Sequence, residues 1–157
     1  MGILLLGVDG LGLEGVRALW RKGYLLSLKS LAERGIIATP RTCFPPQTVP
    51  AWVSIFTGVN PGKHGVFSFF SSGRLCTGLD IMFPPIYEIF SMLGIPVAMI
   101  NVPLSYPFPV LFGVGISDWL APRRTIRVSI RKSPNIARYL AEEYKHTSPR
   151  LWKHVMN

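Results

Sequence analysis

The sequence predicts an α/β fold in which a mostly parallel sheet is flanked by helices. Two continuous apolar runs, residues 3–8 and 95–100, are typical of central strands that are buried on both faces. Between these runs, apolar residues recur every three or four positions, which is the spacing of helices that cover a sheet. With 157 residues and 48% apolar content, the chain can form one domain with a sizeable core.

The first predicted strand, residues 3–8, ends at Asp9. A polar residue in this position lies at the sheet edge where open α/β folds collect their ligands. Helical spacing of apolar residues then begins at Leu13 and predicts two helices, the second capped by Ser27 and stopped by Gly35. These helices would cover one face of the sheet.

A short strand is predicted at residues 36–39, and the three prolines of residues 40–46 exclude regular structure after it. Thr48 opens the next helix, because Pro50 is tolerated only in a first turn and Gly58 is a typical helix end. The apolar face of this helix consists of Val49, Trp52, Val53 and Phe56. The sequence therefore places Thr48 at a helix N-terminus.

The remaining elements follow from the same patterns. Residues 86–93 have helical spacing, and residues 95–100 and 111–117 are predicted strands. From residue 125 to 131 apolar and polar residues alternate, which indicates a half-exposed strand. Ser133 and Pro134 are a favourable cap and first residue for a final helix.

The net charge of +9 is concentrated in the last quarter of the chain. Residues 1–118 contain 8 Lys/Arg and 6 Asp/Glu, a balance of +2, whereas residues 119–157 contain 9 and 2, a balance of +7. We therefore predict a single domain over 1–157, with a core at 1–122 and a basic strand and helix at 123–157. Binding of nucleic acid or of an acidic partner by this basic segment stays open as an alternative.

Targeting and redox signals point to the cytoplasm. No apolar run approaches the roughly 20 residues that span a bilayer, and the N-terminus lacks the basic start of a secretory signal. We expect Cys43 and Cys76 to be reduced thiols, although a disulfide between them stays open, because proteins from hot environments can carry one inside the cell. Gln47 is the only glutamine, a composition that hints at a thermophilic source.

Asp9 and Thr48 are the residues whose positions suggest chemistry. Both are expected at the same edge of one sheet, where a carboxylate and a hydroxyl can share a metal ion. A helix N-terminus favours an alkoxide and a neighbouring phosphate oxygen, and a divalent cation would lower the pKa of the hydroxyl further. Taken alone, the two residues are also compatible with an ordinary loop carboxylate and an ordinary helix cap.

Three segments of the chain resemble a known enzyme family. Residues 44–52 read Phe-Pro-Pro-Gln-Thr-Val-Pro-Ala-Trp, residues 57–65 read Thr-Gly-Val-Asn-Pro-Gly-Lys-His-Gly, and residues 7–10 before them read Gly-Val-Asp-Gly. Together they resemble the type I phosphodiesterase and nucleotide pyrophosphatase family of the alkaline phosphatase superfamily. The similarity continues through 95–103 and 113–122, about the first three quarters of the chain.

The resemblance implies the N-terminal part of an alkaline phosphatase-like fold and a two-metal hydrolase. In the family, the aspartate that matches Asp9 binds one of two metal ions, usually zinc, and the threonine that matches Thr48 is the nucleophile. We expect both Asp9 and Thr48 to be metal ligands. His64 matches an element that shapes the loop after the nucleophile helix, so we interpret it as structural. The phosphate-binding asparagine of many nucleotide pyrophosphatases has no counterpart in residues 66–69, which read Val-Phe-Ser-Phe.

The family takes most of its metal ligands from sequence beyond the part that this chain resembles. The acidic and histidine residues that remain are interpreted as solvated surface: Asp80, Asp118, His146 and His154. We therefore expect the missing ligands to come from a longer chain or a partner, and a homo-oligomer or partner chain to cover the open sheet. The alternative is a non-catalytic form of the fold that self-associates, and the expected substrate is a small phosphate ester.

Overall fold

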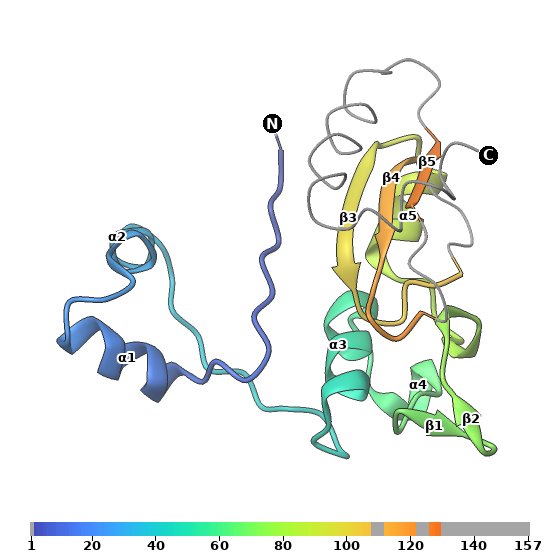
Figure 1. The fold of residues 1–157 in the computed structure, drawn as a ribbon, viewed down its shortest axis with the longest axis horizontal. Coiled ribbons are helices and arrows are strands. Elements are labelled where there is room, and N and C mark those ends of the chain that lie inside the picture. Colours follow the sequence, from blue (N-terminus) through green and yellow to red (C-terminus); the bar gives the residue numbers. More distant parts are fainter. Residues whose placement is uncertain (1, 108–111, 122–125, 130–157) are drawn as a thin grey trace, which may run out of the picture. The chain divides into compact units, whose positions relative to one another are not determined.

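A computed structural model describes residues 2–107, 112–121 and 126–129, the last four by their backbone only (Figure 1). The chain divides into two units, Met1–Thr42 and Cys43–Asn157, and each is described here by itself. The predicted helix at Ser133-Pro134 and most of the basic segment lie outside the described residues, so both stay predictions.

The first unit contains two helices, α1 (Leu13–Arg21) and α2 (Leu26–Glu33), where the spacing predicted them. The prediction that Ser27 caps α2 is wrong, because the helix already begins at Leu26. Leu25 precedes it in the left-handed conformation with φ 53°, and this sharp turn allows the helix to start directly after it. Among the described residues of this unit only Val16 is buried.

The strands predicted at residues 3–8 and 36–39 are not present, since both segments are irregular. Their side chains are also exposed, with Leu4 at 88% and Ile36 at 97%. A strand is stabilised by hydrogen bonds to a neighbouring strand, and no described residue pairs with either segment. An apolar run therefore indicates a tendency to be buried but does not supply the partner that makes it a strand.

The helices of the second unit follow the predicted pattern closely. α3 (Thr48–Thr57) begins at Thr48 and ends at Gly58, whose φ of 70° is the left-handed conformation of a helix end. α5 (Ile86–Met92) follows as predicted, whereas α4 (Pro61–His64) is a single turn that the apolar spacing does not indicate. A 3-10 turn, η1, spans Gly78–Asp80.

The described strands form two small sheets. β3 (Val97–Val102) pairs parallel with β4 (Gly113–Ser117), and β4 pairs antiparallel with β5 (Ile126–Ser129). β1 (Phe70–Ser71) and β2 (Arg74–Leu75) form a short antiparallel hairpin. The predicted strands at 95–100, 111–117 and 125–131 are thus confirmed in place, but the sheet that they form is mixed. The described fold is a mixture of helices and strands with small sheets.

Gly113 begins β4 at a point where the two parallel strands approach closely. Its φ is 144°, and a Cβ built on it would lie 1.9 Å from the carbonyl oxygen of Val97 on β3. No side chain fits against a backbone oxygen at that distance. Glycine is therefore required here.

The core of the second unit lies between α3, the hairpin and the chain that leaves β3. Its buried residues are Val49, Val53, Val66, Cys76 and Leu104. A second cluster, with Tyr87 and Met99 at its centre, packs α5 on the sheet (Figure 1). Cys43 and Cys76 are both free thiols, as expected. Within the described residues, no helix is long and apolar enough to cross a membrane.

Candidate functional site

Thr48 is the first residue of α3, and its side chain is half-buried. The two residues that follow it, Val49 and Pro50, are fully buried and fix the first turn of the helix to the core. The N–H groups of a first turn have no intrahelical carbonyl to bind, and the helix dipole adds positive charge there. Thr48 is thus a partly exposed residue at a helix end that favours an anion.

His64 connects α4 to α3 from inside the core. It has 0% exposure, and its Nε2 lies 2.9 Å from the Oγ of Ser54 on α3. Its Nδ1 accepts a hydrogen bond of 3.2 Å from the backbone N–H of Val66. Because Nδ1 is an acceptor, the ring proton is assigned to Nε2, which donates to Ser54.

This arrangement supports a structural interpretation of His64. A histidine whose Nε2 already carries the proton cannot take one from the Ser54 hydroxyl, so the pair does not form a nucleophile and base. Burial lowers the pKa of His64 and keeps the ring neutral. The side chain therefore holds the segment after α3 in place, which is the role implied by the resemblance.

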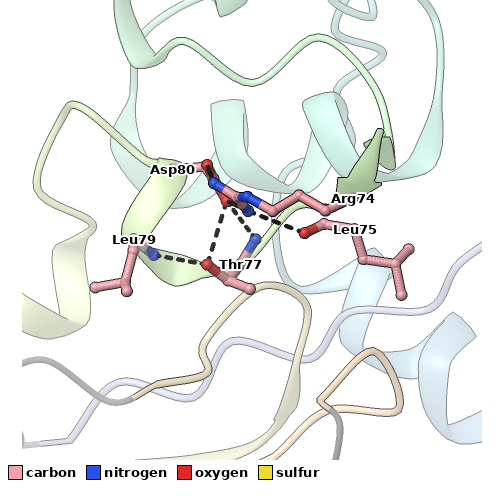
Figure 2. A network of polar contacts seen from close by, with 5 residues as sticks. All are labelled: Arg74, Leu75, Thr77, Leu79 and Asp80. Atoms are coloured by element: carbon pink, nitrogen blue, oxygen red, sulfur yellow. Dashed lines mark hydrogen bonds and ion pairs between the residues drawn. The ribbon is translucent and has the colours of Figure 1, made fainter. Parts of the chain in front are cut away.

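Arg74, Thr77 and Asp80 form a polar network beside the hairpin (Figure 2). The guanidinium of Arg74 donates to both oxygens of Asp80, at 2.9 and 2.6 Å, and the N–H of Thr77 donates to Asp80 Oδ2 at 2.7 Å. The hydroxyl of Thr77 in turn accepts from the N–H of Leu79 and caps the 3-10 turn. The bond to Arg74 lowers the pKa of Asp80 to about 2. Asp80 is thus engaged in local structure.

Asp118 is buried, so its interpretation as solvated surface is wrong. Its residue exposure is 1%, and its oxygens accept the backbone N–H groups of Leu104 at 2.5 Å and of Ala121 at 3.1 Å. Burial raises the pKa of Asp118, while the backbone hydrogen bonds act in the opposite direction. The sequence carried one signal of this position, an aspartate directly after a buried strand with apolar residues following it.

Asp9 belongs to the first unit, where it forms a turn with Gly10. Its side chain is exposed, and its Oδ1 accepts the N–H of Gly10 at 3.1 Å. Thr48 belongs to the second unit. The structure therefore describes the surroundings of these two predicted site residues separately.

The described residues do not make a metal centre on their own. No three side chains of His, Cys, Asp or Glu lie close enough together to hold a metal ion in this part of the chain. A two-metal site needs several such ligands around each ion. His146 and His154 lie outside the described residues. Asp9 and Thr48 together fall short of the donor set that a two-metal hydrolase requires.

Comparison with protein families adds to this geometry. Residues 3–75 match the sequence model of the type I phosphodiesterase / nucleotide pyrophosphatase family. The resemblance is thereby confirmed for the N-terminal part of the chain, which includes Asp9, Thr48 and His64. Its continuation through 95–122 lies beyond the match and stays a prediction. No curated protein and no solved structure matches the chain.

The matched family is that of the type I phosphodiesterases and nucleotide pyrophosphatases, and the match covers residues 3–75 of the 157. The matched segment contains the whole of α1, α2, α3 and α4 and the hairpin. It ends before β3, β4 and the buried Asp118. The two predicted site residues, Asp9 and Thr48, therefore lie inside the match, whereas the parallel strands β3 and β4 lie outside it.

Proposed function

We propose that this chain forms part of a metal-dependent hydrolase of phosphodiesters or nucleotide pyrophosphates, with Thr48 as the nucleophile. The observation that carries the proposal is the position of Thr48, a half-buried hydroxyl at the first residue of α3 within the family match. The complete enzyme would have an alkaline phosphatase-like α/β fold.

In this proposal the hydroxyl of Thr48 gives its proton to solvent and its oxygen attacks phosphorus, while the bond from phosphorus to the leaving-group oxygen breaks and the leaving group takes up a proton. Water then attacks the same phosphorus of the threonyl phosphodiester, breaks its bond to the Thr48 oxygen and releases a phosphate monoester, and the Thr48 oxygen regains a proton. The N-terminal end of α3 favours the negative charge on the attacking oxygen and on the phosphoryl group. The buried residues Val49 and Val53 keep that helix end in place.

The metal would be a divalent ion, most simply zinc, which lowers the pKa of a bound hydroxyl and acts as a Lewis acid. We assign Asp9 as a ligand and Thr48 as the hydroxyl that approaches the ion. The further ligands would come from outside the described residues, from a second copy of the chain or from a partner chain. A phosphate ester is the proposed substrate.

A second candidate is a non-catalytic form of the fold that self-associates. The exposed apolar residues of the first unit favour it, because Leu4, Leu26 and Ile36 are all more than half exposed. Apolar segments of this kind are typical of surfaces that another chain covers. Both candidate functions assume that another chain covers the exposed apolar residues. They differ in whether Thr48 acts as a nucleophile.

Hydrolysis of bis(p-nitrophenyl) phosphate with added zinc or manganese separates the candidates. We expect metal-dependent turnover that Thr48→Ala lowers by roughly 10³-fold or more, as removal of a nucleophile does. Thr48→Ser keeps a hydroxyl and should retain part of the activity. Thr57→Ala is the matched control, because the Thr57 hydroxyl lies in the same helix but binds the carbonyl of Val53 at 2.7 Å.

Light scattering after size exclusion, at several protein concentrations, completes the test. Self-association together with turnover supports the hydrolase, and self-association without turnover supports the non-catalytic candidate. A species that stays monomeric at every concentration contradicts the second candidate. Turnover that Thr48→Ala leaves unchanged contradicts the first.

A further inference from the structure

Asp118 holds the chain that leaves β3 in a defined position. It follows β4 directly, and Ser117 and Asp118 are both buried at the carboxyl end of that strand. One carboxylate oxygen accepts the N–H of Leu104, beyond the end of β3, and the other accepts the N–H of Ala121. A carboxylate with backbone donors on both oxygens is rigidly placed, because it cannot rotate without leaving a buried N–H unpaired.

Leu104 needs such support. Its φ of 56° is a left-handed conformation that is unfavourable for a residue with a branched side chain, and such residues persist where the surroundings hold them. A second bond fixes the same segment from its other end, where the carbonyl of Tyr106 accepts the N–H of Gly78 at 2.6 Å. Residues 103–106 are thus held by the end of β4 on one side and by the 3-10 turn on the other.

The side chain of Leu104 packs against α3, so the position of Leu104 affects the position of that helix. It is 2% exposed and packs in one cluster with Val49 and Val53, the residues that anchor the first turns of the helix. Val49 is the neighbour of Thr48 in the chain. Figure 1 shows the chain that leaves β3 running beside α3. A continuous set of contacts therefore runs from Asp118 through Leu104 to the helix end that carries Thr48.

We propose that Asp118 is a positioning residue for Thr48, acting through Leu104. The proposal rests on the function proposed for Thr48 and adds a residue from beyond the family match to its site. Asp118→Asn has one acceptor oxygen instead of two, so its amide NH₂ would face the N–H of Leu104 or Ala121. Leu104 would then move, and the first turn of α3 would lose its fixed place against the core.

A thiol at position 48 reports this placement without requiring turnover. The parent is the full chain with Thr48→Cys and with Cys43→Ser, which leaves one thiol in the tryptic peptide that contains position 48. A thiol at a helix N-terminus has a pKa below the ordinary value near 8.5, so its rate of alkylation by iodoacetamide against pH measures how well the helix end is formed. Mass spectrometry of that peptide gives the rate.

We expect Asp118→Asn to slow alkylation at pH 7 by about three- to tenfold, because one unit of thiol pKa is about a factor of ten in thiolate. Leu104→Ala keeps the N–H that Asp118 binds but removes the packing, and it should give a similar decrease. The double variant should be no slower than the slower single variant, since both act through one set of contacts. Glu88→Gln is the matched control, a half-buried carboxylate on α5 with no bond to Leu104, and should leave the profile unchanged.

Circular dichroism of every variant identifies those that remain folded. If Asp118→Asn does not fold, Leu104→Ala alone tests the link, and an unchanged profile in that variant overturns the proposal. A folded Asp118→Asn with the parent profile also overturns it, as does an equal decrease in Glu88→Gln or full additivity in the double variant. If Thr48→Ala keeps its turnover, the proposed function fails, but the alkylation profiles still decide the role of Asp118. In an active enzyme, Asp118→Asn should lower kcat and leave KM near the parent value.

Discussion

The two units use the same kind of sequence pattern with different results. In the second unit the amphipathic helices α3 and α5 have buried faces, with Val53 at 1% and Tyr87 at 6% exposure. In the first unit α1 and α2 also form as their spacing predicts, yet Leu26 and Leu31 on α2 are 62% and 61% exposed. The difference teaches that apolar spacing predicts where a helix lies, whereas a core requires facing elements. Helices as short as α1 and α2 are only marginally stable without such packing.

The largest expected effect contrasts one isoleucine from each unit. Ile116→Ala removes a side chain that is 2% exposed in β4 and should lower the free energy of unfolding by about 2–5 kcal/mol. Ile36→Ala changes a side chain that is 97% exposed and should alter it by less than about 0.5 kcal/mol. Urea unfolding followed by circular dichroism measures both values.

The same two variants can also contradict the claim that the apolar residues of the first unit are exposed. If Ile36→Ala proves as destabilising as Ile116→Ala, Ile36 is buried in solution, and another chain or another segment covers the first unit. Repeating the measurement at a lower protein concentration separates these cases. Only coverage by a second copy weakens on dilution.

His64 should make the free energy of unfolding of the second unit depend on pH. The first unit has no such dependence on histidine, because residues 1–42 contain none. Its folded pKa lies below the ordinary value of 6.5, so at mildly acidic pH the unfolded chain binds more protons than the folded one. The free energy of unfolding is therefore unaffected by the titration of His64 above about pH 6.5 and decreases as the pH falls below that value, because the unfolded chain then binds the proton more readily. One proton changes the free energy of unfolding by at most about 1.4 kcal/mol per pH unit.

The measurement is the free energy of unfolding between pH 5 and 8 for the parent and for His64→Gln. We expect His64→Gln to be less stable at pH 8, since it loses the bonds to Ser54 and Val66, and the gap between the two proteins to narrow toward pH 5. His146 and His154 are present in both proteins and cancel. A gap that stays constant with pH would show that His64 titrates as a free histidine.

The smallest expected changes in the free energy of unfolding come from two glycines, one in the left-handed conformation and one inside a right-handed helix. Gly58 ends α3 with φ 70°, so Gly58→Ala should destabilise the protein by about 1–2 kcal/mol. Gly15 lies inside α1, and a Cβ there meets no atom within 4 Å. Gly15→Ala should therefore stabilise α1, by about 0.4–1 kcal/mol.

Helix content by circular dichroism and thermal unfolding tests this sign change. A higher midpoint of thermal unfolding with Gly15→Ala confirms that the face of α1 that carries Gly15 is open, because the added Cβ then raises helix propensity without a clash. If Gly15→Ala instead lowers stability, the face of α1 that carries Gly15 is covered in solution, and the contrast between the units is smaller than the structure indicates.

The helices could be predicted from the sequence where residues within or next to the helix mark its ends. Thr48, Pro50 and Gly58 marked both ends of α3 because a first-turn proline and a left-handed glycine have few other uses. The strands at 3–8 and 36–39 were predicted wrongly, since apolar character does not specify a hydrogen-bonding neighbour. The mixed direction of the sheet was equally hidden, because the direction of β5 depends on a connection that its alternating pattern does not describe.

The candidate site could be predicted only in part for the same reason. Thr48, Asp9 and His64 all lie within the family match. The burial of His64 and its hydrogen bonds agree with the structural role that the resemblance implies. The place of Asp118 after a buried strand was visible in the sequence, but its hydrogen bond was not, because the N–H that it accepts lies fourteen residues earlier in the chain. The pair of Arg74 and Asp80 was missed too, since six residues of hairpin and turn bring the two charges together.

Gly113 determines more than the start of β4. Because its missing Cβ faces the carbonyl of Val97, a slip of β4 by one residue in either direction would bring Phe112 or Val114 to that point, and each carries the Cβ that does not fit. The hydrogen atom that stands in place of a Cβ on Gly113 thus selects one alignment of the two parallel strands over its neighbours. That alignment places Ser117, the last residue of β4, opposite Val102, the last residue of β3, and so brings Asp118 within reach of the N–H of Leu104.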